Sequence, residues 1–157
     1  TSCKWEHYKP VFFSEAEIDL LNEMGESILP ETPDSPGAKA VKIAHFIDKY
    51  TADCCTPAQQ QLLRQGLLAF QQACQNQQGR AFIDFTAEEK YHWLAAIDQQ
   101  ARQSQEPHYF GLLKNLVLLG YFTSREGATQ ALRYVPVPGK YQGDYPWKPG
   151  DKAWALG

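Results

Sequence analysis

Glu89 and His92 have the Glu-x-x-His spacing, the first of three sets of residues in this chain whose types could do chemistry. On a helix this spacing puts a carboxylate and an imidazole on one face, as in the iron ligands of di-iron bundles. Such a site also needs a second copy of the motif and two more glutamates on facing helices, and the sequence offers neither. The competing interpretation is a surface histidine at the edge of an aromatic core. If the pair bound a metal, the chain would be a stand-alone redox protein.

The second set consists of the cysteines Cys3, Cys54, Cys55 and Cys74. Cys54 and Cys55 precede an expected helix and Cys74 lies near its far end, so about 25 Å separates them at 1.5 Å per residue. A disulfide needs Cα atoms within about 7 Å. Cys74 could therefore pair only with Cys3, which leaves Cys54 and Cys55 to each other. One bridge from Cys3 to Cys54 or Cys55, with Cys74 reduced, is an equal alternative. The adjacent pair Cys54-Cys55 could also act as a redox switch, but it lacks the Cys-x-x-Cys spacing of thiol oxidoreductases.

Two of the other three histidines, His7 and His108, form the third set and stand in loop-like surroundings without an evident partner, and His45 lacks a Glu three residues before it. The sequence contains no serine elbow, glycine-rich phosphate loop or paired catalytic carboxylates. We therefore predict no catalytic, cofactor-binding or metal site in this chain.

The composition predicts one folded domain. The chain has 157 residues, 43% of them hydrophobic, which suffices for a core of its own. A net charge of -3 without a Lys/Arg stripe argues against nucleic acid as a partner. No apolar run approaches the roughly 20 residues that span a bilayer. The start at Thr1, without an initiator Met, fits a mature chain whose export signal has been removed, although a recombinant form would begin in the same way.

Capping residues and 3.6-residue periodicity predict an all-α fold of five to six helices over residues 1–132. Ser14, Thr56 and Thr86 each begin a capping box, and Ser35-Pro36 has the pattern of a helix start. Gly79 and Gly120 are expected to end helices. The predicted helices span residues 15–29, 36–50, 57–78, 87–103, 109–120 and 124–132.

Residues 133–157 predict an extended C-terminal arm of the same domain. Four prolines remove backbone donors and three glycines permit turns, so neither a helix nor a central strand can continue through this segment. Five Tyr and Trp side chains nevertheless provide the amphipathic contact area typical of interfaces. Fully extended, the arm could reach about 80 Å. It could wrap a partner, or fold back on its own helices.

Two stretches of the chain resemble the gluconate 2-dehydrogenase subunit 3 family, whereas Cys54 to Asp84 has no matching motif. The first runs from Phe12-Phe13-Ser14-Glu15 through Leu20-Leu21, Ile28-Leu29-Pro30-Glu31-Thr32 and Pro36-Gly37-Ala38 to Phe46-Ile47-Asp48. The second runs from Gly120-Tyr121-Phe122-Thr123-Ser124 through Gly127 and Leu132-Arg133-Tyr134 to Pro138-Gly139-Lys140-Tyr141-Gln142-Gly143. Together they bracket nearly the whole chain in the order of that family.

The resemblance implies a small accessory subunit that has no cofactor of its own and is not itself an enzyme. Its partner would be a large FAD-dependent dehydrogenase subunit of the glucose-methanol-choline type, in some complexes joined by a cytochrome c subunit. Members of this family typically carry a twin-arginine export signal for both subunits, so that the folded flavoprotein reaches the periplasm as a hitchhiker, at the inner membrane. The partner's substrate stays open among gluconate, glucose, fructose and glucosides. On this view the arm grips the flavoprotein through Tyr134, Pro138, Gly139, Tyr141, Tyr145 and Trp147.

Overall fold

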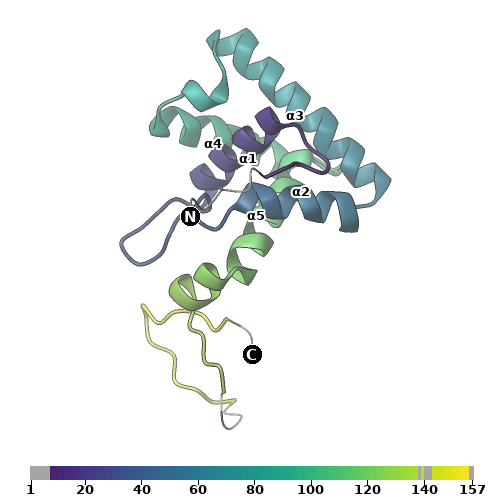
Figure 1. Cartoon of the computed structure of the whole chain (residues 1–157). Coiled ribbons are helices and arrows are strands. Elements are labelled where there is room, and N and C mark those ends of the chain that lie inside the picture. The colour runs from purple at the N-terminus through teal and green to yellow at the C-terminus, as the bar shows by residue number, and fades with distance from the viewer. Residues whose placement is uncertain (1–7, 138, 140–142, 156–157) are drawn as a thin grey trace, which may run out of the picture.

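The computed structural model describes residues 8–137, 139 and 143–155 of the chain. Its described part is all-α, as predicted, with the helices packed around α5 and an irregular loop projecting from the C-terminal end (Figure 1). In order, the elements are α1 (Glu15–Ile28), α2 (Ile43–Cys54), α3 (Pro57–Gln78), the short 3₁₀ turn η1 (Phe82–Asp84), α4 (Ala87–Gln103), α5 (Tyr109–Thr123) and the π-helical turn η2 (Gly127–Ala131). No helix in this part combines the length and apolar character needed to cross a membrane.

The three predicted capping boxes are all present, and they fix the starts of α1, α3 and α4. Ser14, Thr56 and Thr86 each accept a hydrogen bond from the backbone three residues later. In each case the Glu or Gln at that third position bonds back to the cap residue, so two free donors at the helix end are satisfied. Gly79 ends α3 in the left-handed conformation, as expected.

The prediction for the second helix was wrong at its start, because α2 begins at Ile43 after Lys42 in the left-handed conformation. Ser35 instead pairs with Thr32 in a tight turn, and the carbonyl of Pro36 accepts a hydrogen bond from the Tyr121 hydroxyl on α5. The Ala38 amide bonds to the Leu29 carbonyl at the end of α1. Contacts with distant parts of the chain thus replace the local helix start.

Gly120 does not end α5, which continues to Thr123. It lies where α5 crosses α2. A Cβ atom at this position would come within 2.3 Å of the Phe46 ring and 2.7 Å of the Ile43 side chain. The glycine therefore serves close helix packing. The expected sixth helix exists only as the π-helical turn η2, which follows a Ser124 cap.

α5 is the central element of the described residues, because it packs against α1, α2, α3 and α4. Phe110, Leu113 and Val117 on α5 are fully buried beside Leu21 of α1 and Leu67 of α3 in a single hydrophobic core. Ala131 is the last residue that packs against this core among those described.

Asp48 of α2, which is fully buried, holds the segment before α1 in place. One carboxylate oxygen accepts hydrogen bonds from the amides of Phe12 and Phe13, at 2.9 and 2.8 Å. The other accepts from the Val11 amide and the Tyr8 hydroxyl, both at 2.7 Å. Burial alone would raise the pKa of Asp48, but these four hydrogen bonds lower it below its ordinary value. The carboxylate is therefore charged and fully satisfied inside the protein.

Candidate functional site

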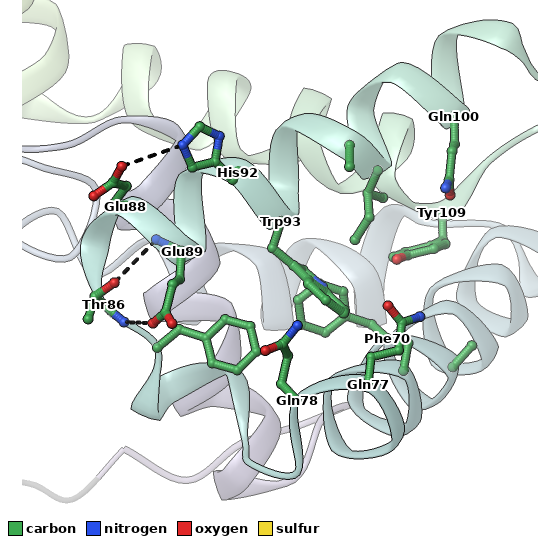
Figure 2. A pocket seen from close by; sticks show the side chains of 15 residues that line it. Phe70, Gln77, Gln78, Thr86, Glu88, Glu89, His92, Trp93, Gln100 and Tyr109 are labelled. Carbon is green, nitrogen blue, oxygen red and sulfur yellow. Dashed lines mark hydrogen bonds and ion pairs between the residues drawn. The ribbon is translucent and has the colours of Figure 1, made fainter.

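Glu89 and His92 lie on the first two turns of α4, but their side chains interact with different residues (Figure 2). The Glu89 carboxylate accepts a hydrogen bond from the Thr86 amide at 2.7 Å and pairs with Arg80. Its bonds to Thr86 and then to Arg80 lower its pKa. His92 is exposed, 3.8 Å from Glu88. In the described part of the chain, no three His, Cys, Asp or Glu side chains cluster as metal ligands do.

An open groove of about 740 Å³ separates α3 from α4, a feature that the sequence did not predict. Phe70 of α3, Trp93 of α4 and Tyr109 of α5 are among the residues that line it (Figure 2). Gln77, Gln78 and Gln100 lie along the rim. Burial raises the pKa of Tyr109 to about 12, so its hydroxyl is neutral at physiological pH. The groove offers apolar contact area rather than a nucleophile and a base in contact.

The cysteines of the described region are free thiols with different exposure. Cys54 is exposed and Cys55 half-buried at the end of α2, whereas Cys74 is buried within α3. Burial raises the pKa of the Cys74 thiol to about 11 and also raises that of Cys55. Cys3 lies outside the described residues, so a bridge through Cys3 stays a prediction.

Two histidines have structural roles that spacing did not reveal. His108 caps α5, because its Nδ1 atom accepts a hydrogen bond from the Phe110 amide at 3.1 Å. The His45 ring stacks on Tyr8 with 3.7 Å between the ring centres. His108 stands directly before the helix start expected at residue 109, and this N-cap position is a signal that could have indicated the first role. His7 lies outside the described residues.

The C-terminal arm is irregular, as expected, and its two ends are paired. The Arg133 amide donates to the Ala153 carbonyl at 2.8 Å, and the Ala155 amide donates to the Arg133 carbonyl at 2.9 Å. The Arg133 guanidinium lies over the rings of Tyr145 and Trp154, at 5.0 and 4.2 Å from their centres. The arm therefore forms a closed loop that projects from η2 (Figure 1).

The predicted partner-binding residues fall on this loop. Tyr134 and Tyr145 are partly exposed, and Trp147 is 71% exposed. Gly139 adopts a positive φ of 77°, which suits a turn. Pro138 and Tyr141 lie outside the described residues. The sequence interpretation counted Trp154 among the aromatic contact residues but did not predict its pairing with Arg133, since neither residue type nor spacing indicated that residues 21 apart would meet.

Comparison with protein-family models supplies the decisive observation. The model described as gluconate 2-dehydrogenase subunit 3 matches residues 15–139, most of the chain. This chain belongs to that family. The match begins at the first residue of α1 and runs through α5 and η2 into the loop, so it covers all the helices described above. Comparisons with curated proteins and with solved structures gave no match.

Proposed function

We propose that this chain is the non-catalytic small subunit of a periplasmic FAD-dependent dehydrogenase that oxidises a sugar, a glucoside or a sugar acid. The membership in the subunit 3 family carries the proposal, because the family is described as one subunit of a dehydrogenase. FAD belongs in this proposal to a large partner subunit of the glucose-methanol-choline type. The small subunit assists the export, folding and stability of that flavoprotein, and a cytochrome c subunit is a further candidate member of the complex.

The contrast between body and loop supports an accessory role. The body buries a single core, whereas the loop carries the two most exposed large apolar side chains of the described residues, Val137 and Trp147, at 81% and 71% exposure. Exposed aromatic side chains such as Trp147 are enriched at protein interfaces. An obligate interface of this kind gains most of its affinity from a few aromatic anchors.

Co-purification from the native host tests the proposal. A tag on this chain should recover an FAD-containing protein several times larger than 17.8 kDa. A version ending at Leu132 should lose it while keeping the circular dichroism spectrum of a helical body. Recovery by both versions would keep the subunit role but place the interface on the helices. Recovery by neither would remove the proposal.

Elemental analysis and a free-thiol count separate this function from a stand-alone redox protein using Glu89 and His92 or Cys54 and Cys55. An accessory subunit should contain no stoichiometric metal when purified alone. About one equivalent of metal that disappears in Glu89→Gln and His92→Ala would favour the redox alternative instead.

A further inference from the structure

We propose that the C-terminal loop is a preformed docking element, closed by Arg133, which inserts Trp147 into an apolar hollow of the large subunit and sets Lys148 against a carboxylate there. This inference rests on the proposed function and adds the part of the surface that binds, the residue that shapes it and the chemistry of the opposing face.

Arg133 closes the loop with both its backbone and its side chain. The backbone pairs with Ala153 and Ala155, as described above. The guanidinium donates a hydrogen bond to the Tyr145 hydroxyl at 2.6 Å while lying over the rings of Tyr145 and Trp154. The two rings also contact each other edge to face, with 5.4 Å between their centres. A planar guanidinium can stack and donate at once, which an ammonium group cannot do.

A hydrogen-bonded turn follows Trp147 directly. The segment Lys148-Pro149-Gly150-Asp151 has Pro and Gly at the central positions of a type II turn, and Gly150 has a φ of 95°. The Asp151 amide donates to the Lys148 carbonyl at 3.0 Å, and the Asp151 carboxylate accepts from the Lys148 amide at 2.9 Å. Trp147 thus stands directly before a turn that is bonded at both ends.

A fixed loop lowers the entropic cost of binding. Ordering a flexible arm of this length would consume much of the binding free energy, whereas a segment whose ends are already paired at Arg133 and Ala155 and whose turn at 148–151 is already formed has less freedom to lose in the complex. The exposed indole of Trp147 then acts as an aromatic anchor for an apolar hollow of the partner, as the residues of interface hot spots commonly do.

Charge indicates what surrounds that hollow. Residues 133–157 contain four basic and two acidic residues, whereas residues 1–132 contain eleven basic and sixteen acidic ones. Arg133 is engaged within the loop, while Lys148 lies exposed next to Trp147. The loop is therefore the basic part of an acidic chain, which favours a partner surface with carboxylates near the hollow.

The closure is tested on the isolated full-length chain by hydrogen exchange of the Ala155 and Arg133 amides. Arg133→Lys keeps the charge but loses the stacking, and both amides should exchange at least about tenfold faster while amides of α5 stay protected. Unchanged exchange in this variant would overturn the closure.

The docking is tested by titrating the full-length variants against the purified FAD-containing subunit. Trp147→Ala and Arg133→Lys should each weaken binding at least about tenfold, and Lys148→Glu should slow association and remove much of its salt dependence. Tyr91→Ala and Lys49→Glu are the matched controls, since both residues are exposed on helices of the body, and they should bind as the wild type does. Wild-type affinity in the three loop variants would overturn the docking inference but keep the subunit role. A wild-type chain that binds no flavoprotein would overturn the proposed function itself.

Discussion

The carboxylate of Asp48 accepts a hydrogen bond from the Phe13 amide at 2.8 Å, although 35 residues separate them in the sequence. This bond and its three companions connect the segment before α1 to the middle of α2. The family match includes Asp48 and begins just after Phe13, at residue 15. The contact therefore joins a buried residue inside the matched region to a residue just before that region.

Replacing Asp48 with Asn should lower the free energy of unfolding by about 3 kcal/mol, because four donors lose a charged acceptor and two of them then face an amide NH₂ group. Urea denaturation followed by circular dichroism measures the change. The matched control is Asp53→Asn, an exposed position on the same helix, which should change stability by less than about 0.5 kcal/mol. Equal effects of the two substitutions would contradict this role of Asp48.

The same site predicts how stability depends on pH. The pKa of Asp48 is lower in the folded than in the unfolded chain, where it is about 3.9. Its contribution is therefore complete above that unfolded value and is lost as the pH falls through the folded value. The stability difference between wild type and Asp48→Asn should be constant from pH 7 to about 5 and shrink below about 4. A difference that grew on acidification would show that the folded pKa is raised instead.

Substitution of Gly120 by Ala should destabilise the protein by about 1–3 kcal/mol, because the new methyl group would overlap the Phe46 ring between α5 and α2. Gly111→Ala is a control on the same helix, since no atom lies within 4 Å of its Cβ position. There the helix propensity of Ala should leave stability unchanged or raise it by up to about 1 kcal/mol. Thermal unfolding distinguishes the two results, and a harmless Gly120→Ala would mean that α2 and α5 pack less closely than described.

The structure at the start of α4 predicts different roles for Glu89 and His92, although their Glu-x-x-His spacing is that of a shared metal site. Thr86→Ala removes the helix cap and should cost about 1 kcal/mol. Glu89→Gln should also lower the melting temperature, because Arg80 loses its charged partner, whereas His92→Ala should leave it unchanged. A shared metal site would instead make the effects of Glu89→Gln and His92→Ala similar and dependent on added metal.

Alkylation should rank the cysteines by exposure. Cys54 should react first with iodoacetamide at pH 8, Cys55 more slowly, and Cys74 only when the chain unfolds, because it is buried and its thiol pKa is about 11. Peptide mass spectrometry under native and denaturing conditions gives the order. Protection of Cys54 that ends on reduction would reveal a bridge, and the mass of the linked peptide would show whether its partner is Cys3 or Cys55.

The sequence predicted the elements that depend on local chemistry. Three helix starts were predicted correctly from their cap residues Ser14, Thr56 and Thr86. Each cap residue satisfies free backbone amides within its own turn, so the signal is local. Gly79 ends α3 for an equally local reason.

Features that depend on distant contacts were not predictable in this way. The late start of α2 depends on hydrogen bonds that join the preceding loop to Tyr121 and Leu29. Gly120 was wrongly predicted to end a helix, because its role is set by contact with Phe46 on another helix. The loop shows both cases, since its aromatic residues were recognised as contact area but its closure by Arg133 requires residues from both ends to meet.

The central position of α5 has a consequence for biosynthesis. Among the described residues, α1, α2, α3 and α4 all pack against residues 109–123, yet all four precede α5 in the order of synthesis. At about 5–20 residues per second, the apolar faces of the first 108 residues stay without their common partner for several seconds of translation. The nascent body therefore exposes apolar faces that chaperones bind until residues 109–123 have emerged. Pausing codons placed before α5 would lengthen that interval.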